Sequence, residues 1–265
     1  MYSPITLIRK YLTYYLTASN GKGHGIHSPF VFELVTQVLN DNKKYYAYTA
    51  IEEMRQRMLH DHTVINVDDK GAGSVVSRSA QRKISTIART ALKPKKFGQL
   101  LFRMVNHYQP NTILELGTSL GITTAYLGAA RSGSRLVSIE GSDAIANQAA
   151  INLGKLGITN VHLVKGDFDE VLKPLLERLS AVDFAFVDGN HRKEPTLRYF
   201  EEILRFSHPN TILVFDDIHW SREMEEAWAA ICRHPLVRCT VDLFFVGMVF
   251  LRPEFKTRLH FTIRF

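Results

Sequence analysis

Cysteines are scarce in this sequence. Its 265 residues include only 2, Cys232 and Cys239, which is too few for a disulfide framework. Neither belongs to a C-x-x-C pair, and neither has histidines at zinc-finger spacing. A disulfide-stabilised scaffold and a zinc finger are therefore excluded, and a reducing compartment is the default expectation.

Long apolar runs are also absent. No run approaches the length that a membrane-spanning helix needs. The short apolar run at residues 5–8 precedes the first basic residues, Arg9 and Lys10, which is the reverse of the order in a secretory signal peptide. By elimination we expect a cytoplasmic protein with no membrane partner. With 45% apolar residues, the chain can bury a full globular core.

Acidic residues are under-represented in the N-terminal part. Residues 1–100 contain 15 Lys and Arg against 7 Asp and Glu, a balance of +8, whereas residues 101–265 contain 18 against 19, a balance of −1. The densest basic piece, residues 70–114, has no acid. Such a patch would suit RNA or an acidic substrate. Because no aromatic residue for base stacking lies between Arg78 and Lys96, we favour a solvated helical face.

The dinucleotide-binding loop G-x-G-x-x-G is missing too. In its place stands I-L-E-L-G-T-S-L-G at residues 113–121, a buried-strand pattern that runs into a turn and then into helix-forming sequence. Gly117 and Gly121 are four apart, and Glu115 stands two positions before the first glycine. Closer glycines would let the backbone approach a pyrophosphate. This acidic loop better suits a ligand with a cationic or amino end, such as S-adenosylmethionine, although ordinary strand-to-turn junctions share the pattern.

From residue 111 onward, short β-type runs alternate with helix-length segments. The strand candidates are residues 112–116, 135–139, 161–165, 184–187 and 211–215. Their alternation with helices predicts a doubly wound, mostly parallel α/β sheet. Two more β-type runs, at residues 237–245 and 248–251, are joined by a very short link around Gly247. Only antiparallel strands allow such a link, so we expect seven strands with an antiparallel C-terminal strand.

The first 110 residues show another pattern. Apolar residues at helical spacing within residues 8–16 and a helical segment at residues 29–39 predict a helical cap. Two glycine-containing stretches, residues 20–27 and 69–73, could be mistaken for ligand loops. Neither follows a convincing strand and opens a helix, so we interpret both as ordinary loops.

Acidic residues stand at the ends of all five predicted parallel strands. In an open parallel sheet these ends open into the ligand-binding loops. The residues concerned are Glu115, Glu140, Asp167 after Gly166, Asp188 with His191, and Asp216-Asp217 with His219. Glu140 stands where an acid would accept both ribose hydroxyls of an adenosine ligand. Clustered carboxylates repel one another unless a cation or ligand is present, so the series predicts a ligand site.

The ordered motifs E-L-G-T-S-L-G, I-E-G-S, K-G-D-F, F-V-D-G-N-H and V-F-D-D resemble those of class I S-adenosylmethionine-dependent methyltransferases, especially the catechol O-methyltransferase-like branch. The resemblance covers about residues 98–251. It implies a Rossmann-like S-adenosylmethionine-binding domain over residues 98–265 and a helical cap over residues 1–97. It further implies cofactor contacts at Glu115, Gly117, Ser119 and Gly121 for the methionine part, Glu140 for the ribose, and Gly166 and Asp167 for the adenine.

The same resemblance implies a metal site. In metal-dependent members, the aspartate of the fourth strand and an acidic pair closing the fifth hold a divalent cation that binds the acceptor hydroxyl. Asp188, Asp216 and Asp217 occupy these positions. Three carboxylates suit magnesium, manganese or calcium. Two positions depart from the catechol type, which has asparagine where Asp217 stands and a lysine base where His191 stands.

Histidine is a suitable base near neutral pH, and we select His191 as the catalytic base. It would equally fit a satisfied polar residue of a pocket wall or another metal ligand, and for His219 we favour such a structural role. The expected function is cation-assisted methyl transfer to an oxygen of a small molecule. An RNA acceptor recruited by residues 78–96 and a ligand-binding protein without turnover are the alternatives, and the cap would close over the site or form a homodimer contact.

Overall fold

The computed structural model describes residues 1–67 and 81–265. The chain divides into two compact units: unit 1 consists of Met1–Asp41 and Leu175–Phe265, and unit 2 of Asn42–Pro174. Each is described by itself. The glycine-containing stretch at residues 69–73 and Arg78 of the basic stretch lie outside the described residues.

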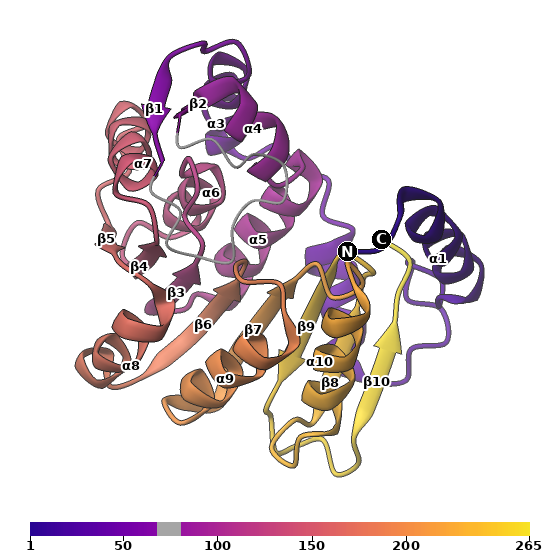
Figure 1. Ribbon diagram of the computed structural model, residues 1–265. Helices are drawn as coiled ribbons and strands as arrows, with labels where there is room; N and C mark the ends of the chain where they lie inside the picture. Colours follow the sequence, from indigo (N-terminus) through magenta and orange to yellow (C-terminus); the bar gives the residue numbers. More distant parts are fainter. Residues whose placement is uncertain (68–80) are drawn as a thin grey trace. The chain divides into compact units, whose positions relative to one another are not determined.

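Unit 2 is built around three parallel strands. They are β3 (Thr112–Leu116), β4 (Arg135–Glu140) and β5 (Val161–Lys165), with β4 in the centre. Helix α6 (Ile122–Ala130) connects β3 to β4, and α7 (Asp143–Lys155) connects β4 to β5 (Figure 1). Ile113, Leu136 and Val137 are fully buried. Such near-continuous apolar runs are typical of parallel strands that are covered on both faces.

Helices make up most of the remainder of unit 2. These are α3 (Tyr46–Leu59), α4 (Ile84–Ala91) and α5 (Lys95–Tyr108), accompanied by a two-stranded antiparallel ribbon of β1 (Val64–Asn66) and β2 (Gln81–Lys83). Helices α3 and α5 both pack on α6. The helical character predicted for the first 110 residues is confirmed for those that the structure describes, whereas the ribbon was not predicted, because its strands have only 3 residues each.

Unit 1 contains five further strands. Their order is β6 (Val182–Val187), β7 (Ser207–Asp216), β9 (Val246–Phe250), β8 (Cys239–Asp242) and β10 (Leu259–Thr262). Strand β9 is antiparallel to both of its neighbours, and the other pairs are parallel. Helix α8 (Phe168–Leu179) crosses the boundary between the units, α9 (Lys193–Leu204) connects β6 to β7, and α10 (Arg222–Arg233) follows β7.

The predicted class, a doubly wound, mostly parallel α/β protein, is confirmed, and the antiparallel strand expected near the C-terminus is β9, whereas the last strand, β10, is parallel to β8. Apart from the ribbon of β1 and β2, the described residues form eight strands, whereas seven were expected. The prediction missed β10, which is a short edge strand with alternating burial and a polar His260 in it. The expected position of the final turn was also wrong, because Gly247 lies inside β9 and residues 243–245 form the link. A Cβ atom at Gly247 would stand 2.6 Å from the Trp228 ring, so glycine is required there by packing.

The N-terminal elements of unit 1 are helical, as predicted. Helix α1 (Pro4–Thr17) begins at Ser3, whose hydroxyl accepts from the Thr6 amide. Helix α2 (Pro29–Glu33) continues into a π-helical turn at Leu34–Leu39. Figure 1 shows α1 beside β10, and Ser19 forms a bridge with Ile263 there.

Residues 1–41 of the predicted cap group with unit 1, and the described residues from 42 to 97 group with unit 2. The domain boundary at residue 97 stays a prediction. Within the described ranges, none of the helices is long and apolar enough to cross a bilayer.

Candidate functional site

The loop between β3 and α6 has an unusual backbone. Gly117, Ser119 and Gly121 all have positive φ angles, of 100°, 48° and 83°, a region that glycine enters most readily. The Gly117 amide donates to the Ile139 carbonyl of β4 over 3.0 Å. A Cβ atom at Gly121 would approach the Ala149 Cβ to 3.3 Å. The two glycines therefore allow the loop to lie tightly between β4 and α7.

Glu115 holds the base of this loop. Its side chain is fully buried, and its Oε2 accepts hydrogen bonds of 2.6 Å from the hydroxyls of Thr124 and Ser138. Thr124 belongs to α6 and Ser138 to β4. The carboxylate thus links β3 to both neighbouring elements. Its predicted contact with a cofactor stays a prediction.

Glu140, at the end of β4, reaches across to the same loop. Its Oε2 accepts from the Ser119 amide over 2.8 Å, and its Oε1 accepts from the Ser142 amide over 3.0 Å. The hydroxyl oxygens of Ser119 and Ser142 are buried and have no hydrogen-bond partner among the described residues. Buried hydroxyls are normally satisfied. Two of them beside one carboxylate indicate a place for a polar ligand.

Gly166 and Asp167 bring the end of β5 to this edge. The Gly166 amide donates to the Glu140 carbonyl over 3.0 Å. Gly166 has a φ of 146°, and a Cβ atom there would lie 2.6 Å from Val171 Cγ1. Asp167 Oδ1 accepts from the Asp169 amide over 2.9 Å at the start of α8. The three strand ends of unit 2 therefore meet, and all seven predicted cofactor residues belong to them.

Unit 1 assembles a second group of charged side chains. Asp188, His191 and Asp216 each offer one ligand atom, and these atoms all lie within 4.8 Å of one another. His191 Nε2 lies 3.6 Å from Asp188 Oδ1. Asp216, at the end of β7, is buried, whereas the other two are partly buried. Two carboxylates and an imidazole are a donor set that fits a divalent cation.

Asp217, the third predicted metal ligand, is not in this group. Its backbone is left-handed, with a φ of 52°, and its amide donates to the Phe245 carbonyl over 2.7 Å. Asn190, between Asp188 and His191, has the same φ of 52°. Left-handed non-glycine residues gather at functional sites, where they redirect side chains. The structure thus brings together Asp188, Asp216 and His191, and the ligand role of Asp217 stays a prediction.

His219 lies in a polar network instead. Its Nδ1 is 3.1 Å from Glu225 Oε1 and its Nε2 is 2.8 Å from Asp242 Oδ2. Burial lowers the pKa of His219, but the hydrogen bonds to the two carboxylates outweigh burial and raise the pKa above its ordinary value. The ring also stacks on Phe244. This agrees with the structural role that we favoured for His219.

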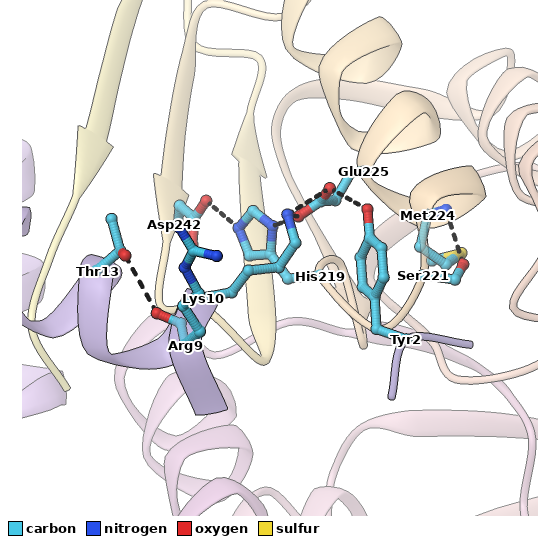
Figure 2. Close-up of polar contacts among 9 residues, drawn as sticks. All are labelled: Tyr2, Arg9, Lys10, Thr13, His219, Ser221, Met224, Glu225 and Asp242. Atoms are coloured by element: carbon cyan, nitrogen blue, oxygen red, sulfur yellow. Dashed lines mark hydrogen bonds and ion pairs between the residues drawn. The ribbon is translucent and has the colours of Figure 1, made fainter. Parts of the chain in front are cut away.

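The network extends to the N-terminus, which the sequence did not indicate. Figure 2 shows Tyr2, Lys10 and His219 all directed toward the carboxylate of Glu225. Lys10 Nζ lies 2.9 Å from Glu225 Oε1, and the Tyr2 hydroxyl donates to Glu225 Oε2 over 2.7 Å. The partners are separated by more than 200 positions, so no local pattern could reveal them. Together they fix the start of α1 near the segment that follows Asp217.

Known proteins resemble this chain in sequence. A family model described as a methyltransferase domain matches residues 114–218. The catechol O-methyltransferase of Niastella koreensis is 33% identical over 126 residues, which cover 46% of this chain and 55% of the relative. The chain thus spans about half the length of this curated relative.

Solved structures share the fold. The O-methyltransferase TomG of Streptomyces achromogenes, involved in tomaymycin synthesis and solved in complex with SAM, superimposes with a TM-score of 0.57 at 18% identity and covers 79% of this chain and 91% of its own. The O-methyltransferase of Bacillus cereus, solved with SAH, gives a TM-score of 0.52 at 20% identity and covers 83% and 97%. Residues 114–218 therefore match a methyltransferase-domain model, the chain is similar in sequence to a catechol O-methyltransferase, and it shares the fold of solved O-methyltransferases.

Proposed function

We propose that the protein transfers a methyl group from S-adenosylmethionine to a hydroxyl of a small molecule, with help from a divalent cation. The observation that carries the proposal is the arrangement around Glu140. One carboxylate is oriented by two loop amides and flanked by the buried hydroxyls of Ser119 and Ser142. The SAM and SAH bound in the two solved relatives support this assignment.

The strand ends of unit 2 would bind the cofactor. Glu140 would accept hydrogen bonds from the ribose hydroxyls, and Asp167 would face the adenine amino group. The loop of Gly117, Ser119 and Gly121 would hold the methionine part, with the buried Glu115 keeping the loop on β4. No pyrophosphate-binding glycine pattern is needed, because S-adenosylmethionine contains no pyrophosphate.

The strand ends of unit 1 would bind the acceptor. Asp188 and Asp216 would hold a magnesium, manganese or calcium ion, together with Asp217 or His191. A bound cation lowers the pKa of the acceptor hydroxyl and fixes its orientation. When His191 is not a ligand, its imidazole would take the hydroxyl proton. The oxygen then bonds to the methyl carbon as the carbon–sulfur bond breaks, and S-adenosylhomocysteine leaves.

Isothermal titration with S-adenosylmethionine tests the core of the proposal. We expect binding to the unaltered protein and a loss of at least about tenfold in affinity for Glu140→Ala, because each lost charged hydrogen bond contributes about 1.5–3 kcal/mol. Glu53→Ala removes an exposed carboxylate of α3 and serves as the matched control. An unaltered protein that gives no heat, or a Glu140→Ala variant that binds normally, would contradict the proposal.

A further inference from the structure

Helix α1 carries a stripe of apolar side chains that face solvent. Ile5 is 80% exposed, Ile8 61%, Leu12 54% and Leu16 77%, and Tyr15 beside them is 45% exposed. Their spacing of three and four residues places them on one face of the helix. We call these five residues the outer stripe.

The opposite face of α1 is firmly packed on unit 1. Tyr14 and Ala18 are buried against Phe244, and the Tyr14 hydroxyl donates to the Ile263 carbonyl over 2.5 Å. Lys10 is paired with Glu225. The outer stripe is therefore a second apolar face on a helix whose first face already contributes to a core. Burying it inside unit 1 would require breaking these contacts.

The surroundings of the outer stripe are basic. Residues 1–32 contain Arg9, Lys10 and Lys22 and no Asp or Glu. Arg9 and Lys22 are exposed, and the guanidinium of Arg264 lies 4.4 Å from the centre of the Tyr15 ring. Because Lys10 is neutralised by Glu225, Arg9 is the exposed charged side chain of α1, and Arg264 adds a second positive charge at Tyr15.

We propose that the outer stripe of α1 docks on the surface of an anionic lipid bilayer. An amphipathic helix with apolar side chains, a tyrosine and a basic flank lies in the plane of a membrane surface, where the apolar groups enter the acyl boundary and the basic groups meet anionic headgroups. The stripe from Ile5 to Leu16 is about 16 Å long at 1.5 Å per residue, so the helix lies on the bilayer and does not cross it. We expected no membrane partner because the sequence has no long apolar run. That absence excludes a membrane-spanning helix but not a helix that lies on the membrane surface.

A second copy of the chain fits the stripe less well. Arg9 lies near the middle of α1, which spans Pro4–Thr17. In a symmetric pair the two stripes would face each other, and the two Arg9 side chains would come close together with no acid in α1 to compensate them. Anionic headgroups remove this conflict.

Vesicle flotation tests the proposal on the full chain. We expect the protein to float with phosphatidylcholine vesicles containing phosphatidylglycerol, at least about tenfold better than with phosphatidylcholine alone, and to be released by salt. The double variant Ile8→Glu with Leu12→Glu should lose this binding. Thr13→Glu, combined with Thr17→Glu, adds the same charge at exposed polar positions of α1 and should weaken the binding only several-fold, because the stripe stays intact.

Arg9→Gln separates charge from burial, since it leaves the stripe intact and should weaken flotation several-fold. Circular dichroism and thermal unfolding of each variant show whether the fold is kept. Equal flotation with both kinds of vesicle, no flotation, or equal losses in the two double variants would overturn the proposal. So would a dimer in light scattering that disappears in Ile8→Glu with Leu12→Glu while the unaltered protein ignores vesicles. None of these readouts depends on methyl transfer.

Discussion

The two groups of acidic residues at the strand ends are stabilised in different ways. In unit 2, Glu115 and Glu140 accept hydrogen bonds from hydroxyls and backbone amides of adjacent loops. In unit 1, Asp188 and Asp216 approach each other and His191 within 4.8 Å. Neutral donors can hold a carboxylate without any ion, whereas carboxylates that converge favour a cation among them. The comparison therefore supports the proposal of an organic ligand at unit 2 and a metal ion at unit 1.

Removing the Asp216 carboxylate should have the largest effect, because it should abolish metal binding in unit 1. Manganese at about 100 times its dissociation constant should stabilise the unaltered protein by about 2.7 kcal/mol, measured as a rise in Tm. In Asp216→Ala this rise in Tm should vanish. The activity of the variant without chelator should be as low as the activity of the unaltered protein with chelator.

Asp217→Asn is the comparison variant, because asparagine tolerates the same left-handed backbone. Its manganese-induced rise in Tm should be reduced less than that of Asp216→Ala. If both variants respond to manganese like the unaltered protein, unit 1 does not hold the cation.

Glu115→Ala should have the largest effect on stability in unit 2. The substitution leaves the buried hydroxyls of Thr124 and Ser138 without their acceptor, so we expect a loss of about 2–5 kcal/mol in the free energy of unfolding. Urea unfolding measures this loss. Glu53→Ala should stay within about 0.5 kcal/mol. A small loss for Glu115→Ala would mean that Glu115 is not the anchor of the loop.

Ser142→Ala should distinguish a side chain that contacts the ligand from one that stabilises the fold. Ser142 occupies the N-cap position of α7 without a side-chain capping bond, so its removal should change the free energy of unfolding by less than about 0.5 kcal/mol. Affinity for S-adenosylmethionine should fall several-fold in titration calorimetry.

Ser221→Ala in unit 1 is the matched control for Ser142→Ala. The Ser221 hydroxyl caps α10 by accepting from the Met224 amide over 3.2 Å, so its loss should lower stability by about 1 kcal/mol. Cofactor affinity should not change. The reverse pattern for the two serines would contradict a ligand contact at Ser142.

The smallest expected effect is a pH dependence in unit 1. Burial raises the pKa of Glu225, but the hydrogen bonds from Lys10, Tyr2 and His219 outweigh burial and hold the pKa below its ordinary value. A carboxyl with a lowered folded-state pKa stabilises the fold above its unfolded pKa, and this contribution disappears as pH falls through the folded pKa. We expect about 1 kcal/mol or less, because Lys10 and Glu225 are partly exposed.

Urea unfolding at pH values from 7 to about 3 checks this expectation. The difference in unfolding free energy between the unaltered protein and Glu225→Gln should shrink toward acid. A difference that stays constant over the range would show that Glu225 does not carry this part of the pH dependence.

The sequence by itself determined the class of the fold and the set of candidate residues. Apolar runs of strand length alternating with helices leave few arrangements other than a mostly parallel sheet. The carboxyl ends of parallel strands share one edge of a sheet, so acids such as Glu140 and Asp216 could be assigned to that edge before any coordinates. Gly117 and Gly121 could be recognised as turn residues because of their place between strand and helix.

Only the tertiary structure decided what each side chain contacts. Adjacent residues in the chain point in different directions, so Asp216 joins Asp188 and His191 while Asp217 does not. The pairing of Glu225 with Lys10 joins positions far apart in sequence, and the exposure of one face of α1 depends on which face Phe244 covers. Periodicity gives the faces of an element, but which face is buried depends on long-range packing.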